Sequence, residues 1–135
     1  MRTDKWLDLN CPALEGKRIA VTGTTGGIGR ELCNILASRG AELILMDRNF
    51  ERSSRFADEL YEKHGKRPTL ISVDLSDMAS VIKAAEELVL LTPDIFIHNA
   101  GAYSIPRYTA SLGYDNVFQI NFISPYYIIK KLFLI

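Results

Sequence analysis

Short apolar runs alternate with longer stretches of helical periodicity along most of this chain. Four runs predict buried strands, at residues 18–22 (RIAVT), 42–46 (ELILM), 69–73 (TLISV) and 94–98 (DIFIH). Strands that alternate with helices are typical of a parallel sheet with helices on both faces.

The helical stretches carry start and stop signals that fit this alternation. The first begins after Gly29 and is closed by Gly40, and the second covers residues 50–63 and is closed by Gly65. Ser76 is a candidate cap for a third helix through residue 90, and a long helical region starts near residue 112. No fifth strand follows, so we predict a single Rossmann-type domain over residues 1–135. Its doubly wound parallel sheet has the order 3-2-1-4 and is truncated after the fourth strand.

Charge and composition point to a small-molecule partner. Sixteen basic residues balance sixteen acidic ones, so no net field attracts nucleic acid or an anionic membrane. The N-terminus lacks the apolar run of a secretory signal, and the apolar C-terminal stretch is interrupted by Pro125, Lys130 and Lys131. Cys11 and Cys33 match no metal-ligand spacing and are expected to be free thiols, so we expect a cytoplasmic protein without a metal.

The turn between the first strand and the first helix is rich in glycine. It reads TGTTGGIG from residue 22 to 29, with Gly23, Gly27 and Gly29 in the spacing T-G-x-x-x-G-x-G. Such a turn lets the backbone approach a pyrophosphate, and the helix N-terminus supplies free N–H groups and a positive dipole end. A flexible turn without a ligand is the alternative, but the flanking strand and helix favour a dinucleotide site. The candidate cofactor residues here are Gly23, Thr25, Gly26, Gly27, Ile28 and Gly29.

Asp47 ends the second predicted strand, 18 residues after Gly29. An acidic side chain about 20 residues after such a turn accepts hydrogen bonds from the adenosine ribose hydroxyls and repels a 2′-phosphate, which favours NAD. Arg48 follows directly, and a guanidinium there could bind a 2′-phosphate, so NADP stays open as the alternative.

Further motifs make the chain resemble the short-chain dehydrogenase/reductase family. They are the opening LEGK at residues 14–17, the TGTTGGIG turn, Asp74-Leu75 after the third strand, DIFIHNAG at residues 94–101, and Asn121 in the next helix. The family usually has asparagine where this chain has His98. The resemblance implies an NAD(P)-dependent oxidoreductase that acts on an alcohol or carbonyl substrate.

The resemblance also implies roles for these residues. Asp74 would bind the adenine amino group while the Leu75 backbone holds the ring, although Asp74 taken alone is more often a helix cap. Asn99, Ala100 and Gly101 would stabilise the centre of the sheet and line the cofactor ribose. Asn121 is the catalytic position that the resemblance carries over, whereas a histidine such as His98 at a strand end is more often a core residue.

The family's serine and Tyr-x-x-x-Lys pair belong to a later segment that this chain does not reach. Tyr126 with Lys130 and Tyr127 with Lys131 match the pair's spacing. Tyr126 lies only 25 residues beyond Gly101, well short of the family's spacing, so we interpret both tyrosines as core or interface aromatics. The resemblance also implies a homo-oligomeric full-length parent. Because the serine and the Tyr-x-x-x-Lys pair are missing, we do not expect this chain alone to be active. The competing interpretation is a dinucleotide-binding or interaction protein without redox activity.

Pro125 predicts a feature of the last helix. If the helix continues through it, the missing N–H frees the carbonyl four residues earlier, at Asn121. In the family, that carbonyl binds a water in a proton relay. The alternative is that the helix breaks near Ser124 and that Pro125 begins another.

Overall fold

The computed structural model describes residues 3–133 and contains one parallel sheet. Its strands are β1 (Arg18–Thr22), β2 (Glu42–Asp47), β3 (Thr69–Ser72) and β4 (Ile95–Ile97). Their order is β3-β2-β1-β4, and every neighbouring pair is parallel. The predicted fold class and strand order are thus confirmed.

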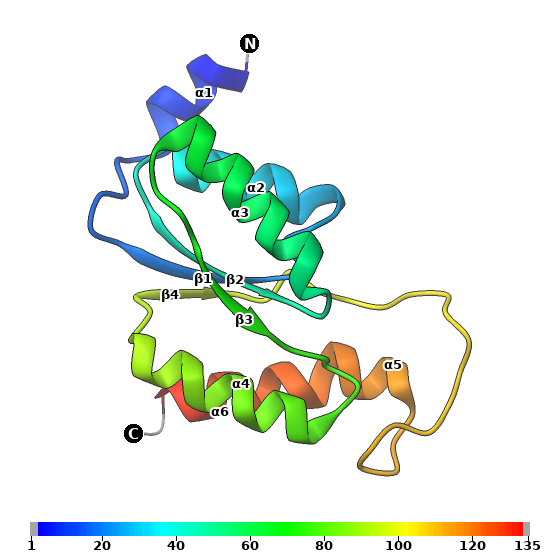
Figure 1. Ribbon diagram of the computed structural model, residues 1–135. Coiled ribbons are helices and arrows are strands. Elements are labelled where there is room, and N and C mark those ends of the chain that lie inside the picture. Colours follow the sequence, from blue (N-terminus) through cyan, green and yellow to red (C-terminus); the bar gives the residue numbers. More distant parts are fainter. Residues whose placement is uncertain (1–2, 134–135) are drawn as a thin grey trace.

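Helices cover both faces of this sheet (Figure 1). On one face α2 (Gly27–Ser38) and α3 (Phe50–His64) pack against Ile19, Val21 and Leu45. On the other, α4 (Met78–Leu91) and α6 (Ser124–Phe133) pack against Ala20, Ile44 and Met46. Because alternate residues of a strand point to opposite faces and both faces of β1 and β2 are buried, these central strands are nearly continuous apolar runs, whereas the edge strands β3 and β4 are partly exposed.

The helix ends follow local capping chemistry, and one cap differs from the prediction made from the sequence. Gly65 closes α3 in the left-handed region at φ 81°, as predicted. Asp77, and not Ser76, caps α4 by accepting from the Ala79 N–H. Ser76 is engaged elsewhere, because its N–H and hydroxyl both donate to Asp74 Oδ1.

A short helix, α1 (Thr3–Asn10), precedes the first strand and was not predicted. It projects from the rest of the molecule (Figure 1), and Trp6 and Leu9 on it are exposed. With few apolar residues and little contact, it leaves no periodic signal in the sequence.

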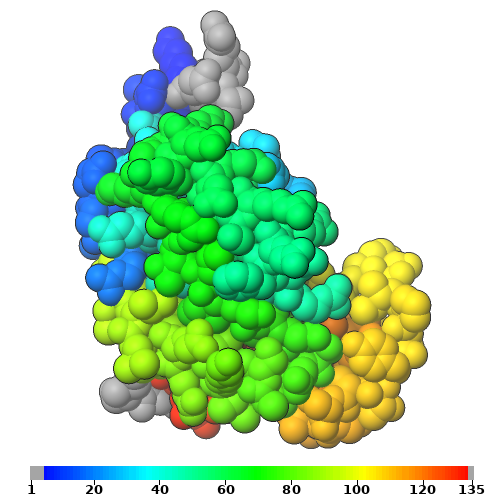
Figure 2. All heavy atoms as spheres, in the orientation of Figure 1, coloured from blue at the N-terminus to red at the C-terminus, as the bar shows by residue number. Residues whose placement is uncertain are grey.

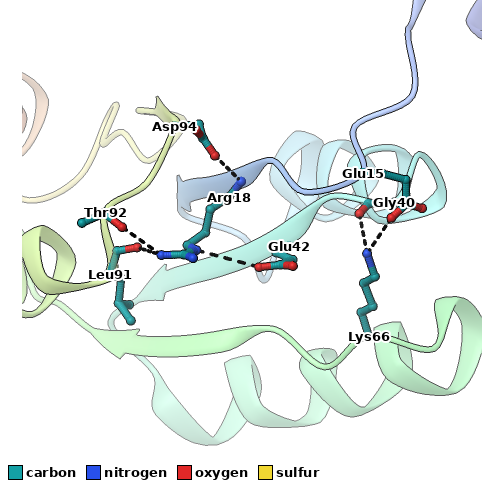
Figure 3. A network of polar contacts seen from close by, with 8 residues as sticks. All are labelled: Glu15, Arg18, Gly40, Glu42, Lys66, Leu91, Thr92 and Asp94. Atoms are coloured by element: carbon teal, nitrogen blue, oxygen red, sulfur yellow. Dashed lines mark hydrogen bonds and ion pairs between the residues drawn. The ribbon is translucent and has the colours of Figure 1, made fainter.

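The amino edge of the sheet is tied together by Arg18 (Figure 3). Its N–H donates to Asp94 at 2.8 Å, and its guanidinium donates to the Leu91 carbonyl and to Thr92 Oγ1. Glu42 on β2 lies 3.8 Å from the same guanidinium. These contacts hold the start of β4 beside β1, so that both strands end together at the opposite edge.

The last helical region is continuous but not uniformly α-helical. It comprises α5 (Asn116–Phe118), a π-helical turn η1 (Gln119–Ile123) and α6. The Ser124 N–H donates to the Gln119 carbonyl, five residues earlier, and Ser124 itself is helical. A break near Ser124 is therefore wrong, because the wider turn accommodates Pro125 without ending the helix.

Within residues 3–133, no helix is long and apolar enough to cross a membrane.

Candidate functional site

A cavity of about 440 Å³ lies at the carboxyl edge of the sheet, where open α/β proteins bind their ligands. One wall is formed by the ends of β1, β2 and β3, including Gly23, Asp47 and Asp74. The other is formed by Ala100 to Tyr103 after β4 and by Ile120. In Figure 2 the yellow and orange segment after β4 stands out beside the body, with the surface hollowed between it and α3.

The glycine turn is packed so closely that side chains do not fit at two of its positions. Gly23 has φ +69°, and a Cβ there would lie 2.8 Å from the Ala100 Cα. A Cβ on Gly29 would collide with the Gly23 carbonyl and lie 2.7 Å from Asn99 Nδ2. The turn and the segment after β4 therefore approach each other closely at the floor of the cavity.

The N-terminus of α2, which follows this turn, has free donors. Its cap residue Gly26 provides no side-chain acceptor, and no acidic residue stands in the first turn. In contrast, Asn49 caps α3 and Asp77 caps α4. The free N–H groups and the helix dipole make this end suited to an anion. Ile28 in the first turn is largely exposed.

Asn99 joins the glycine turn to the end of β4. Its Nδ2 donates to the carbonyls of Thr22 and Gly23, at 3.2 and 2.9 Å. Thr22 Oγ1 in turn accepts from the N–H groups of Asn99 and Ala100, at 3.1 and 3.0 Å. The predicted residues Asn99 and Ala100 are thus brought against the turn, with Gly101 next to them on the cavity wall.

His98 completes this hydrogen-bond group. Its Nδ1 lies 3.1 Å from Thr22 Oγ1. Because both lone pairs of that oxygen accept N–H groups, its hydrogen is left for Nδ1, which must be unprotonated. Burial lowers the pKa of His98 below its ordinary value of 6.5. His98 is therefore a neutral structural residue, as the strand-end position suggested.

We expect His98 to make the fold sensitive to acid. A pKa lowered by folding means that the unfolded chain binds the proton first, so stability is complete above about pH 6.5 and is lost as pH falls through the folded pKa. The variant His98→Asn keeps an acceptor for Thr22 and should show a smaller stability loss between pH 7.5 and 5.5. Urea denaturation of both proteins at the two pH values measures this, and equal losses would contradict it.

Asp47 is more enclosed than the sequence suggested. Its side chain is only 5% exposed, and it accepts from the Thr24 N–H at 2.6 Å, from the Thr24 hydroxyl and from the Ser53 hydroxyl at 2.9 Å. A carboxylate offers about four acceptor positions, so about one is left facing the cavity. Asp47 thus holds the glycine turn against α3 and also contributes to the cavity wall.

Two arginines border the same end of the cavity. Arg48 and Arg52 line it beside Asn49, and Arg52 donates to the Thr25 carbonyl at 3.4 Å. Both are exposed. Their positive charge lies where the adenosine ribose would lie if the turn holds a pyrophosphate.

Asp74 and Leu75 form the third part of this wall. The Asp74 N–H is not available to a ligand, because it donates to Ser80 Oγ at 2.9 Å. One carboxylate oxygen of Asp74 receives both donors of Ser76. Neither of these two bonds uses Asp74 Oδ2.

Asn121 is bound to Ala102, which lines the cavity wall after β4. Its Oδ1 accepts from the Ala102 N–H at 2.7 Å, and its Nδ2 donates to the Ala102 carbonyl at 2.8 Å. Both polar atoms of the side chain are thus used to hold the loop after Gly101. Pro125 has no N–H to offer the main-chain carbonyl of Asn121.

The two tyrosine and lysine pairs lie away from this site. Tyr126 is 57% exposed and stacks on Phe122, on the outer side of the helix. Tyr127 packs against the core with Lys131 Nζ 5.9 Å from its ring. Neither tyrosine lines the cavity.

Four polar residues around the site were not predicted from the sequence. Thr24 and Ser53 hold Asp47, and buried Gln119 and Ser124 hold the carbonyls of Leu75 and Ser76. For Gln119 and Ser124 the available signal was a polar residue inside an otherwise apolar helical stretch. Cys33 is a core residue. Its burial, together with the charge of Asp47, raises the pKa of its thiol to about 12.

The fold and the packed glycine turn define a Rossmann-type α/β protein with a cavity at the carboxyl edge of its sheet. The family model described as short chain dehydrogenase matches residues 17–134, and the chain belongs to that family, the short-chain dehydrogenases/reductases.

Relatives and solved structures agree. An uncharacterised oxidoreductase of Schizosaccharomyces pombe is 33% identical over 130 residues, which cover 93% of this chain and 38% of that protein. A 3-oxoacyl-(acyl-carrier-protein) reductase of Aquifex aeolicus is 38% identical over 90 residues, 65% of this chain and 36% of that protein. A short-chain dehydrogenase structure from Shigella flexneri has a TM-score of 0.73 and 27% identity, covering 90% of this chain and 57% of that chain. The chain therefore spans about two-fifths of the length of the curated relatives it matches.

Proposed function

We propose that this chain forms the dinucleotide-binding part of an NAD(P)-dependent oxidoreductase that acts on an alcohol or carbonyl group. The observation that carries the proposal is the uncapped N-terminus of α2, placed by a tightly packed glycine turn at the edge of a cavity. Membership in a family of oxidoreductases supports the redox role.

The cavity fits such a cofactor in its donor set. The pyrophosphate would lie on the N–H groups of the turn, contributed by Thr25, Gly26, Gly27, Ile28 and Gly29. The adenine would lie against Asp74 and Leu75, and the far ribose against the wall formed by Ala100 and Gly101, which Asn99 joins to the glycine turn. When bound, the nicotinamide supplies a hydride acceptor or donor.

Asn121 is the residue of this chain that we assign to catalysis. Its side chain is occupied by Ala102, so its contribution comes through the main-chain carbonyl. With a proline four residues later, this carbonyl has no α-helical donor and can hold a water for proton transfer.

We infer that NAD is preferred to NADP. Asp47 is held by neutral donors and has no ion-pair partner among residues 3–133, so its negative charge remains at the cavity wall. That charge repels a 2′-phosphate, and its remaining acceptor position fits a ribose hydroxyl. Arg48 and Arg52 are exposed and screened by solvent, which weakens their attraction for the phosphate.

We further infer that the protein assembles with copies of itself and is located in the cytoplasm. Phe118, Phe122 and Tyr126 form an exposed stacked stripe on α5, η1 and α6, and we assign this stripe to a subunit contact of a homo-oligomer. The free thiols of Cys11 and Cys33 favour a reducing cytoplasm.

A dinucleotide-binding protein without redox activity is the competing function, and a turnover assay separates the two. We expect the 135-residue chain alone to bind the cofactor but to show no turnover of alcohols or ketones, because Asn121 is its one assigned catalytic residue. A chain extended with a segment that carries the family's serine and Tyr-x-x-x-Lys pair should turn over such a substrate. Reduction by the short chain that disappears in Tyr126→Phe or Tyr127→Phe would show that our placement of these tyrosines is wrong.

A further inference from the structure

Two buried polar side chains connect the helix that carries Asn121 to the wall assigned to adenine. Gln119 and Ser124 are both 0% exposed. Ser124 Oγ donates to the Leu75 carbonyl at 2.6 Å, and Gln119 Nε2 donates to the Ser76 carbonyl at 2.8 Å. The two side chains therefore hold consecutive carbonyls of one loop.

The π-helical turn explains why both side chains reach this loop. In an α-helix with 3.6 residues per turn, residues five apart point to different sides. The hydrogen bond from the Ser124 N–H to the Gln119 carbonyl, five residues back, brings these two positions onto the same side. Asn121 lies within the same turn and binds Ala102 instead.

The Gln119 side chain has further partners that fix its orientation. Its Nε2 lies 3.3 Å from Ser111 Oγ, which accepts from the Met78 N–H at 2.9 Å. Its Oε1 accepts from the Leu112 N–H at 3.4 Å. A buried polar network that is satisfied in this way specifies one arrangement of the elements it joins.

We propose that Gln119 and Ser124 are positioning residues that set the adenine-binding loop at Leu75 and Ser76 relative to Asn121 and Ala102. One helical turn then contacts both walls of the cavity, so binding at the adenine end changes the contact between Asn121 and Ala102. This proposal rests on the proposed function, because it takes the loop at Leu75 to be the adenine site.

The test uses AMP, which carries only the adenine end of the cofactor. Ser124→Ala removes one hydroxyl, and Gln119→Met removes the amide at similar size. Each should weaken AMP binding about five- to tenfold, the effect of losing about one hydrogen bond from a binding loop. Ile128→Val is the matched control, because Ile128 is also 0% exposed on α6 and has no polar atom. It should leave the AMP affinity unchanged.

A spectroscopic signature distinguishes positioning from a purely structural role. At saturating AMP, the amide resonance of Ala102 should shift in the wild type and in Ile128→Val, and stay in place in Ser124→Ala and Gln119→Met. Unchanged AMP affinity in both variants, or an Ala102 shift that persists in them, would overturn the inference while leaving the proposed function intact. Absence of both NADH and AMP binding in the wild type would overturn the proposed function, and this inference with it.

Discussion

Replacing Gly29 with alanine should abolish dinucleotide binding, with an affinity loss of more than about 100-fold, equivalent to about 3 kcal/mol. The new Cβ would collide with the Gly23 carbonyl and press on Asn99 Nδ2. Either the turn moves or Asn99 releases it, and both movements displace the N–H groups that face the cavity. The loss of close packing should also lower the free energy of unfolding by about 1–3 kcal/mol.

Gly26→Ala is the control for this change. Gly26 has extended backbone at φ −146°, and a Cβ on it would meet nothing within 4 Å. Its free energy of unfolding should stay within about 0.5 kcal/mol of the wild type. Denaturant titrations and NADH fluorescence on both variants make the comparison. Normal NADH binding by Gly29→Ala would show that the turn does not hold the pyrophosphate.

Asp47→Asn should bring the affinities for NADH and NADPH together. The change removes the negative charge beside the adenosine ribose and keeps one oxygen to accept from Thr24. We expect NADPH binding to improve about tenfold relative to NADH, which corresponds to about 1.4 kcal/mol. Paired fluorescence titrations with the two reduced cofactors measure this ratio.

Arg48→Gln is the matched variant for the opposite charge. This change should weaken NADPH binding about tenfold and leave the affinity for NADH within about twofold of the wild type. Only the 2′-phosphate can form charge-assisted hydrogen bonds with a guanidinium at this place. If the wild type binds NADPH more tightly than NADH, Arg48 and Arg52 outweigh Asp47 and the assigned preference is wrong.

The sequence predicted the centre of the sheet well because burial on both faces makes β1 and β2 nearly continuous apolar runs. Residues 18–22 were predicted with the observed bounds, whereas β4 is shorter at both ends than the run at 94–98. The side chain of Asp94 instead accepts from the Arg18 N–H at the edge of the sheet. Such end effects depend on a neighbour that is distant in sequence.

The glycine turn was also readable from sequence, because its chemistry depends on the absence of side chains at fixed positions. The state of Asp47 was not readable. Its partners Thr24 and Ser53 lie on different elements, so only the fold brings their hydroxyls to the carboxylate. The π-helical turn at residues 119–123 was not predicted from the sequence, for a related reason. Its residues are typical of an ordinary helix, and the carbonyls of Leu75 and Ser76, to which Gln119 and Ser124 donate in this turn, lie on a loop distant in sequence.

Amide hydrogen exchange with and without NADH tests the central claim most directly. The account predicts slower exchange over the glycine turn at residues 23–29 when NADH binds, together with the segments at 74–76 and 99–102. These segments are far apart in sequence and come together at the cavity at the carboxyl edge of the sheet. Unchanged exchange in the turn at an NADH concentration that saturates binding, or protection confined to other segments, would contradict the account.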